Sequence, residues 1–364
     1  MATSESPAVF VQANEMAVAS SPLRVSMMNA SDHERWDDFV FAHPQGTFFH
    51  QSSWMRVMES TYGYRPYYVY AERDGQITGI APTFLVSNWL SGRSLISLPF
   101  AVYGGVCAAD SESENALIAR LEELAIELDV EYLELRNRTG DIRPGYHAVA
   151  RYATFTKPLI TDLDKLYAGL PKDIRYMVRK AEKAGLQVRR GLDQLNNFYR
   201  LMTINLRRLG TPAFPHILFQ NLIHEFPNQV DLALVYCEDK PVAGGMSFKF
   251  REWMQPYYIG SLEEAKTLAA NDYLWWSLIR YAAETGHRTF DFGRSKKVSG
   301  NFDFKKKWNP AIESLSYQVR LVRRTTVPNF SPANPKFDLA TNLWKKLPLG
   351  LTRVIGPRVV RWFP

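Results

Sequence analysis

The chain has 364 residues, more than one hydrophobic core usually organises, so we expect two domains. Its composition, 46% hydrophobic and 22% charged, is that of an ordinary globular protein and argues against the disordered and fibrous classes. The formal net charge is +7, and the excess lies in two segments: residues 171–190 hold seven basic against two acidic side chains, and residues 325–364 hold six against one. A polyanion wrapped around the whole surface is therefore not expected.

The N-terminal segment and the cysteines bear on the cellular compartment, and the histidines bear on metal binding. Residues 1–22 have neither a basic start nor a continuous apolar run, so we expect a disordered leader rather than a secretory signal. No stretch approaches the roughly 18 apolar residues that a membrane-spanning helix needs. Cys107 and Cys237 are far apart and the histidines are scattered, so neither a disulfide framework nor a metal site is indicated. These features predict a cytoplasmic protein.

The first half of the chain predicts a mixed α/β order. A strand at 23–28 precedes a helix through Phe41, which Ser31 and Glu34 would begin as a capping box. A second helix, 50–63, leads to a hairpin over 66–86 with its turn at Asp74-Gly75. Then follow a strand running into the glycine turn "YGGV", an amphipathic helix over 111–128 and a strand over 130–138.

The second half repeats this order. A hairpin at 230–250, a strand into a glycine turn at 252–262, an amphipathic helix at 264–285 and a strand at 287–295 follow one another. Gln76 corresponds to Lys240 and Tyr132 to Thr289, at offsets of 164 and 157 residues. We therefore expect an α/β (α+β) protein with two copies of one fold, over residues 23–158 and 159–325, followed by a tail over 326–364.

Between the halves, the segment "LPKDIRYMVRKAEKAG" (170–185) predicts an amphipathic helix. Lys172, Arg175, Arg179 and Lys183 lie within about 80° of one another on the face opposite the apolar residues. Like charges one turn apart repel unless a counter-charge is present. The face is either solvated or a row of cations for phosphate groups.

Two short motifs match known patterns but have the wrong context. Residues 76–81, "QITGIA", fit the pyrophosphate loop of coenzyme-A-dependent acetyltransferases, which must join a strand to a helix N-terminus, whereas here they lie inside a hairpin strand. His33 and Asp38 have the H-x4-D spacing of some acyltransferases but fall within an amphipathic helix. We assign both a structural role.

The segment "FDFGRSKKVSGNFDFKKKWNP" (290–310) is the strongest candidate for a site. Strand alternation turns Asp291 away from its phenylalanine neighbours, and Ser299 or Asn301 can begin a short helix through Trp308. Lys305 and the two lysines after it are 100° apart on that helix, so they cannot all serve one site. Phe304 and Trp308 share a face, and a lysine beside it could stabilise an oxyanion; the alternative is a basic amphipathic helix with two buried aromatic rings.

Three segments together carry a family resemblance. "FFHQSSWMRVM", "LPKDIRYMVRKAEKAG" and "NDYLWWSLIRYAAETGHRTFDFGRSKKVSGNFDFKKKWNP" resemble the FemAB family of transferases, which includes the peptidoglycan Fem ligases. The resemblance covers about residues 23–322 and is greatest to FemAB-related proteins of exopolysaccharide and exosortase (PEP-CTERM) systems. It implies two tandem GNAT-like domains, each a mixed, largely antiparallel sheet flanked by helices.

The resemblance also implies a reaction and a site. An acyl- or aminoacyltransferase would form an amide or ester bond on a sugar- or lipid-linked envelope precursor. The donor would be a co-substrate, aminoacyl-tRNA or acyl-CoA, with no bound cofactor. Lys305, beside Phe304, would hold the transferred carbonyl, and Asp291 is the second expected catalytic residue. The other expected substrate-binding residues are Trp308, Tyr258, Arg175, Arg179, Lys183 and Arg294.

The tail interleaves basic residues with leucine, valine, tryptophan and phenylalanine. This pattern suits either an anionic membrane surface, at the inner face of the cytoplasmic membrane, or packing on the body of the protein. Two other functions stay open: an acetyl-CoA-dependent GNAT N-acetyltransferase, and a non-catalytic protein that binds nucleic acid through its two basic segments.

Overall fold

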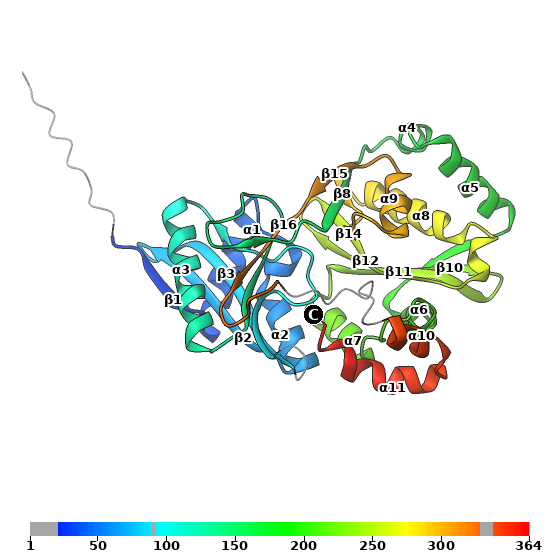
Figure 1. Ribbon diagram of the computed structural model, residues 1–364. Helices are drawn as coiled ribbons and strands as arrows, with labels where there is room; N and C mark the ends of the chain where they lie inside the picture. The colour runs from blue at the N-terminus through cyan, green and yellow to red at the C-terminus, as the bar shows by residue number, and fades with distance from the viewer. Residues whose placement is uncertain (1–20, 89–91, 328–337, 364) are drawn as a thin grey trace, which may run out of the picture.

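The computed structural model describes residues 21–88, 92–327 and 338–363 (Figure 1). Over these residues the chain forms two mixed sheets of eight strands each, and helices cover both faces of each sheet. The predicted leader falls almost wholly outside the described residues.

The first sheet is antiparallel except for one parallel pair, β4–β6. Its strands, in spatial order, are β1 (Arg24–Met27), β2 (Arg65–Arg73), β3 (Gln76–Asn88), β4 (Gly92–Ser97), β6 (Tyr132–Asn137), β16 (Ser316–Leu321) and β7 (His147–Ala148), with β5 (Cys107–Ala108) paired to β3. Helices α1 (His33–Ala42) and α2 (Ser52–Tyr62) pack on one face, and α3 (Ser111–Glu127) packs on the other.

The second sheet repeats this plan, with β12–β13 as its parallel pair. Its strands, in spatial order, are β9 (Gln187–Arg190), β10 (Val230–Cys237), β11 (Lys240–Phe250), β12 (Trp253–Ser261), β13 (Thr289–Asp291), β8 (Tyr152–Pro158) and β14 (Ser295–Lys296), with β15 (Ala311–Ser314) paired to β8. Helices α5 (Lys172–Lys183) and α8 (Ala270–Glu284) cover one face. Helices α6 (Leu195–Leu209) and α7 (His216–Glu225) lie on the other, toward the first domain.

The remaining elements are short connections and the tail. They are α4 (Leu163–Ala168), α9 (Gly300–Lys306), α10 (Asp338–Lys346), α11 (Leu349–Val360) and the 3-10 turns η1 (Ala30–Asp32), η2 (Phe48–His50), η3 (Leu192–Gln194) and η4 (Glu264–Lys266).

Two strands cross the expected domain boundaries. β8, which precedes residue 159, pairs with β13, β14 and β15 in the second sheet. β16, which follows the second domain in the chain, pairs with β6 and β7 in the first sheet. The chain therefore passes between the sheets twice, and the division predicted at residue 158 does not follow the strand pairing. In the first sheet β16 pairs with the side of β6 that β4 leaves open, and in the second sheet β8 pairs with the side of β13 that β12 leaves open.

The local predictions are confirmed at the hairpins and corrected at two helix starts. The Asp74-Gly75 turn joins β2 to β3 with both residues at positive φ, so "QITGIA" does begin a hairpin strand. The first cap is Asn29 rather than Ser31, because the Asn29 side chain accepts from the Ser31 N–H and Asp32 reaches back to the Asn29 N–H. The helix expected from 264 begins at Ala270 after a 3-10 turn.

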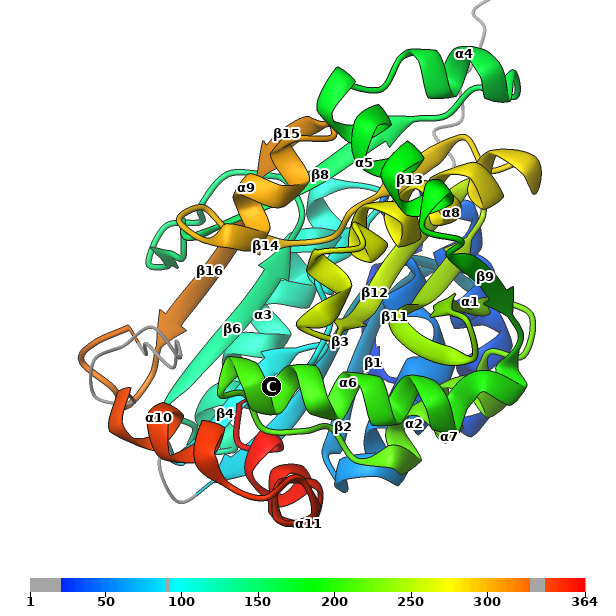
Figure 2. The ribbon, with the colours of Figure 1, turned by 90° about the vertical axis from the view of Figure 1, so that its right-hand side faces the viewer.

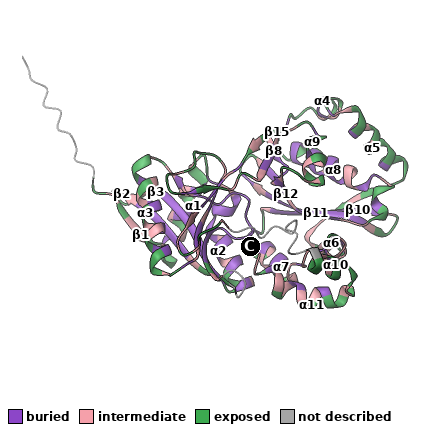
Figure 3. Cartoon of the chain, viewed as in Figure 1, coloured by how far each residue is buried: buried purple, intermediate pink, exposed green. Residues whose placement is uncertain are grey.

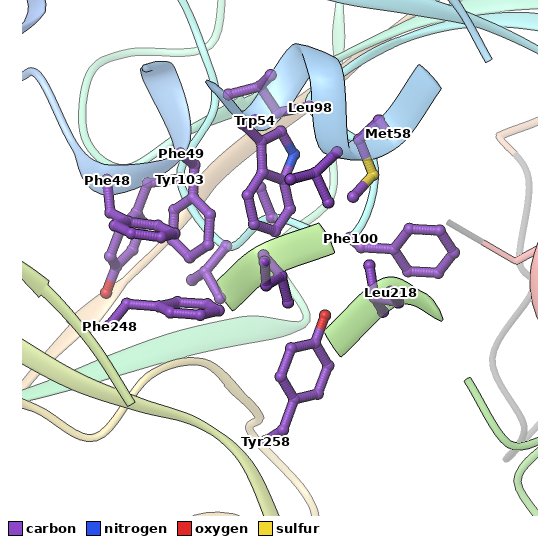
Figure 4. Close-up of a cluster of buried hydrophobic side chains, with 14 of the residues drawn as sticks. Phe48, Phe49, Trp54, Met58, Leu98, Phe100, Tyr103, Leu218, Phe248 and Tyr258 are labelled. Atoms are coloured by element: carbon purple, nitrogen blue, oxygen red, sulfur yellow. The ribbon is translucent and has the colours of Figure 1, made fainter. Parts of the chain in front are cut away.

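An aromatic core joins the two domains (Figure 4). The rings of Phe48, from the first domain, and Phe248, from β11, stack with centroids 4.2 Å apart. Phe49 and Trp54 contact the same Phe248 ring edge-on. Buried residues accordingly run from one sheet to the other in Figure 3. Because the two domains share this core, loops from the first domain can be held firmly against strand ends of the second.

The tail packs on the body, one of the two alternatives left open by the sequence. α10 and α11 lie beside α6 (Figure 2). Arg353 of α11 donates to the Thr203 hydroxyl of α6 at 3.1 Å, and Arg361 donates to the Tyr62 carbonyl of the first domain at 3.1 Å. The tail therefore contacts both domains.

Candidate active site

The candidate site lies where the parallel pair of the second sheet stops. β12 and β13 pair only at Trp253–Thr289 and Met254–Phe290. β13 ends at Asp291, and the chain then turns through Gly293, whose φ of +70° favours glycine. Ser299 caps α9 by accepting from the Phe302 N–H at 3.2 Å, and α9 returns the chain to this turn. The strand end and the short helix together place Asp291 and Lys305 on either side of Gly293.

Lys305 is buried and held by backbone carbonyls. Its Nζ donates to Gly293 O at 3.0 Å and to Arg294 O at 2.9 Å. The ring of Phe155, on β8, has its centroid 5.6 Å from the Nζ. Burial lowers the pKa of this amine, the Asp291 charge opposes the change and the Arg294 charge adds to it, and the pKa is about 7. Lys306 and Lys307 are exposed, so the prediction that the lysine triplet is not one site is confirmed.

Asp291 accepts hydrogen bonds from four groups. The Gly293 N–H lies 2.7 Å from Oδ1 and the Thr154 hydroxyl 3.4 Å from it, while the Tyr103 hydroxyl at 2.8 Å and Gln255 Nε2 at 3.0 Å donate to Oδ2. Burial is the largest influence on the carboxyl and raises its pKa, although these donors and nearby cations oppose the rise. Because Tyr103 belongs to the first domain, Asp291 also fixes the two domains to each other.

Arg294 is a second cation beside Lys305. Its guanidinium lies 4.6 Å from the Tyr152 ring centroid and 5.7 Å from that of Tyr317, and it donates to the Tyr317 hydroxyl at 3.2 Å. Arg294 forms no ion pair with any residue in the described ranges. Aromatic rings stabilise its positive charge. No described carboxylate pairs with it, and its charge lowers the pKa of Lys305.

A cavity of about 730 Å³ opens between the domains and reaches Asp291. Its walls are the first-domain loops 44–50, 103–108 and 137–144 and the ends of β11 and β12. At its inner end lie Tyr103, Gln255 and Asp291. The guanidinium of Arg138, in its wall, lies between the rings of Tyr103 at 5.2 Å and Trp253 at 4.8 Å. A ligand of considerable size could therefore approach the carboxyl end of β13.

His50 and Cys107 also line this cavity, but they do not form a nucleophilic pair. Cys107 Sγ lies 3.4 Å from His50 Nε2, which also bonds to Gly105 O at 3.0 Å. Burial lowers the pKa of His50 to about 4 and raises that of Cys107 to about 12. Because a reactive thiol needs a lowered pKa, the pair is structural.

The aromatic partner of Lys305 differs from the sequence prediction. Phe304 and Trp308 do lie near each other, with ring centroids 6.4 Å apart, but they belong to the core between α9 and α8. The ring beside the lysine is Phe155, 150 residues earlier in the chain. A helix directs residues i and i+4 along one side, and here that side faces the core while Lys305 points to the strand ends.

Four other expected site residues lie away from this centre. Tyr258 is buried in the interdomain core against Phe214 and Phe219. Arg175, Arg179 and Lys183 are on α5, which packs against α8 on the opposite face of the sheet. Of the expected residues, the structure brings together Lys305, Asp291 and Arg294.

Sequence reasoning missed Tyr103, Thr154, Phe155 and Gln255. The two glycines that follow Tyr103 in "YGGV" were a sequence signal for it. A Cβ on Gly105 would lie 1.6 Å from Asn137 Oδ1, so glycine is needed where this loop approaches β6. Thr154 and Phe155 are on β8, whose membership of the second sheet has no local signal. Among the residues that the structure describes, no cluster of His, Cys, Asp and Glu could hold a metal ion.

Comparisons with known proteins agree with this architecture. Residues 170–306, from α5 to Lys306, match a family model described as an acetyltransferase (GNAT) domain. A curated relative is the lipid II:glycine glycyltransferase of Staphylococcus haemolyticus, which is 25% identical over an alignment of 276 residues; the alignment covers 68% of this chain. The aligned part spans about 61% of that relative.

Solved structures with the same fold cover most of the chain. FemX matches with a TM-score of 0.65 at 17% identity, over 87% of this chain and 100% of FemX. The C-terminal domain of a putative lysylphosphatidylglycerol synthetase from Agrobacterium fabrum matches with a TM-score of 0.56 at 16% identity, over 81% and 93%. A tandem GNAT protein from the clavulanic acid biosynthesis pathway matches with a TM-score of 0.52 at 11% identity, over 84% and 100%.

The chain therefore has the fold of tandem GNAT proteins: the repeat predicted two copies of one α/β fold, and the family resemblance implied that this fold is GNAT-like. Within that class, the resemblance to FemAB-type transferases is confirmed, because both the curated relative and FemX are of this kind.

Proposed function

We propose that this protein is an acyl- or aminoacyltransferase that forms an amide or ester bond on a cell-envelope or exopolysaccharide precursor. The observation that carries the proposal is the buried amine of Lys305, held by two backbone carbonyls at the end of the parallel strand pair and beside Asp291. The names of its relatives support the chemistry: one is a glycyltransferase for lipid II, and another a putative lysylphosphatidylglycerol synthetase.

Lys305 contacts the carbonyl of the activated donor in this proposal. When the acceptor attacks, negative charge develops on the carbonyl oxygen, and positive charge on the amine of Lys305, in a site of low dielectric constant, stabilises it. Asp291 keeps the turn at Gly293 in place and so positions the carbonyl groups that hold the lysine. Its four hydrogen-bond donors leave it little capacity to act as a base.

The interdomain cavity is the proposed acceptor site. It has room for a sugar- or lipid-linked headgroup, and it ends at Asp291 and Gln255. Lys305 does not itself line the cavity, but a Cβ on Gly293 would lie 3.8 Å from Gln255 Nε2, which does, and 4.0 Å from Lys305 Nζ, so this glycine is close to both groups. An acceptor entering from the cavity could therefore reach a carbonyl held at Lys305.

We favour aminoacyl-tRNA over acyl-CoA as the donor. A GNAT enzyme places the pyrophosphate of coenzyme A at a helix N-terminus, where free N–H groups and a positive dipole end favour anions. Here Glu263 and Glu264 precede α8 and Asp272 lies in its first turn. By contrast, Arg175, Arg179 and Lys183 on α5 form no ion pair within the described ranges, and are available for the phosphates of an RNA.

The donor can be tested by charge reversal. The double variant Arg175→Glu with Arg179→Glu should weaken binding of aminoacyl-tRNA at least tenfold and flatten its salt dependence. A matched double reversal on the first sheet, Arg24→Glu with Arg93→Glu, should have little effect. Saturable binding of coenzyme A, with unchanged tRNA binding in the first variant, would favour the acetyl-CoA-dependent alternative. Salt-dependent RNA binding without any transfer would favour the non-catalytic one.

We further propose that the tail docks on an anionic membrane from the cytoplasmic side. No helix in the described part of the chain is long and apolar enough to cross a bilayer. The outward faces of α10 and α11 nevertheless expose Leu339, Leu343, Leu351 and Val354 next to Lys345, Lys346 and Arg358. Apolar and basic residues mixed on one face are typical of interfacial helices. A lipid-linked acceptor would be found at such a surface.

Vesicle flotation tests the docking. The protein should float with vesicles containing anionic phospholipid, and the variant Leu351→Ser with Val354→Ser should not. Ile126→Ser, at an apolar residue on α3 that is even more exposed than Leu351 and Val354, is the control and should float like the unmodified protein. Equal flotation of all three would remove the tail from the proposal.

The transferase itself is tested by mass spectrometry of envelope precursors. A strain that lacks the protein should accumulate a precursor lighter by one acyl or aminoacyl group. Complementation with the unmodified gene should restore the mass, whereas Lys305→Ala should not. Identical precursor masses in all strains would overturn the proposal.

A further inference from the structure

The hydrogen bonds of Lys305 match the donors of a neutral amine. A neutral amine has two N–H bonds and one lone pair, whereas an ammonium group has three N–H bonds. The Nζ donates to Gly293 O and Arg294 O, and no third acceptor bonds it within the part of the chain that the structure describes. In the neutral form both N–H groups are satisfied and the lone pair is left for another partner.

Burial of the amine favours this form, and the charge of Arg294 adds to that effect, whereas the charge of Asp291 opposes both. Arg294 lies in the loop beside it, and Asp291, the carboxyl that faces it from β13, is already engaged by four donors. On β8, the amine of Lys157 donates to Trp308 O at 3.3 Å, and the ring of Tyr152 lies against Arg294. Asp303 and Lys306, on α9 itself, are exposed. Lys305 is only 9% exposed, and because this burial is the largest influence on the amine, its pKa is about 7.

The tyrosines and the histidine near this centre are poor proton acceptors at neutral pH. Burial raises the pKa of the tyrosines around it, namely Tyr103, Tyr257 and Tyr317. His50, in the cavity wall, has both ring nitrogens engaged, by Thr47 and Gly105, and its pKa is about 4. A proton leaving an attacking amine thus has one suitable acceptor among the described side chains, Lys305.

We propose that Lys305 acts as a proton shuttle: in its neutral form it accepts the proton of the attacking amine and then delivers it to the leaving oxygen of the donor ester. The inference rests on the proposed transferase function and specifies the role of the same residue. The new N–C bond forms as the amine attacks, and the proton moves from that nitrogen to Nζ. The C–O bond of the ester then breaks, and the proton moves from Nζ to the leaving alkoxide.

The shuttle also accounts for the stabilisation of the oxyanion. The lysine becomes positively charged in the same step that places negative charge on the carbonyl oxygen. A cation that appears only then stabilises the transition state more than the ground state, which is the condition for a faster reaction. No oxidant, metal or further co-reactant is needed.

The first test needs no substrate. Nuclear magnetic resonance of protein labelled with 13C-lysine, with Lys305→Arg used for assignment, should show one lysine that titrates near pH 7. A midpoint near the ordinary lysine value of about 10.5 would overturn the shuttle and leave the transferase proposal intact. A midpoint near 7 in a protein that transfers no group to any acceptor would instead contradict the transferase.

The second test uses the pH dependence of single-turnover transfer. For a shuttle, the rate should rise with pH through about 7, and Lys305→Arg should lose at least a hundredfold although it keeps the charge. For a fixed cation, the rate should fall above pH 7 and the arginine variant should keep most of its activity. The second result would overturn the shuttle. Lys306→Arg, at the exposed neighbouring lysine, is the control and should match the unmodified protein in both rate and profile.

Discussion

In the first sheet the parallel pair β4–β6 aligns Ile96 with Glu134, and in the second the pair β12–β13 stops one residue before Asp291. The offset of 157 residues that relates the two halves makes Glu134 the counterpart of Asp291 and Arg136 the counterpart of Gly293. In the first domain Arg136 Nε donates to Glu134 Oε1 at 2.8 Å, so the strand end is closed by its own ion pair.

In the second domain glycine replaces that arginine. The Gly293 N–H bonds to Asp291, and the space left by the missing side chain admits Lys305 from α9. The strand end in the first domain is thus neutralised by its own arginine, whereas the strand end in the second domain lies near an amine brought by a later element. Under the proposed function, the Lys305–Asp291 centre therefore belongs to the second copy and has no counterpart in the first, and four substitutions can test this.

The largest effect is expected at Asp291. Asp291→Ala removes the acceptor of four hydrogen bonds and leaves buried donors unpaired, which should cost about 3–5 kcal/mol of unfolding free energy. Asp291→Asn should cost roughly half of that, since the amide still accepts some of these bonds, and should slow transfer at least tenfold. Urea unfolding and the transfer rate measure the two effects. Full activity of the asparagine variant would show that Asp291 does not contribute to transfer.

Lys305→Met should change the dependence of stability on pH. The pKa of Lys305 is about 7 in the folded protein and ordinary, near 10.5, in the unfolded chain. Between these values the unfolded state binds more protons, so the stability of the unmodified protein rises with pH, and below pH 7 the full penalty is present. The methionine variant lacks this rise, so its advantage should shrink by about 2–3 kcal/mol from pH 7 to pH 9. The unfolding free energies of the two proteins are measured with urea at several pH values. If they change with pH in parallel, the low pKa is contradicted.

Glu134→Gln is the corresponding change in the first sheet. Loss of the charge opposite the buried Arg136 should cost about 1–2 kcal/mol in urea unfolding, because the amide oxygen can still accept its hydrogen bond. The transfer rate per folded molecule should change less than twofold. A rate loss like that of Asp291→Asn would mean that the first domain contributes a second centre.

The smallest effect is expected at Gly293. Gly293→Ala should cost about 1–2 kcal/mol, the usual penalty for a side chain at positive φ, and should also slow transfer because the new methyl group lies beside Lys305 and Gln255. Gly75→Ala, at φ +75° in a hairpin turn with nothing within 4 Å, is the matched control. Thermal unfolding should show similar losses for both, and the assay a slower rate for Gly293→Ala alone.

The sequence predicted those features that have local causes. Turn residues predicted the hairpins, and the repeat offsets predicted two copies of one fold. Strand alternation predicted that Asp291 points away from the phenylalanines. Helical geometry separated Lys305 from Lys306. The resemblance to a known family supplied the role that we propose for the lysine.

The remainder depends on pairings between distant residues. Nothing near Phe155 indicates that β8 belongs to the second sheet and brings this ring beneath Lys305. The Tyr103–Asp291 bond joins residues 188 positions apart, and only the packed domains bring them together. Local patterns carry no information about such contacts, and the aromatic partner predicted for the lysine was wrong for this reason.

The exchange of β8 and β16 between the sheets has a consequence for biosynthesis. The first sheet cannot be completed until residues 316–321 have left the ribosome, well after its other strands have been made. Until then the side of β6 that β16 later covers presents unpaired backbone groups, which are prone to pair with other chains. Folding of this protein should therefore be largely post-translational, and chaperone dependence should be greatest for nascent chains that end between residues 137 and 316.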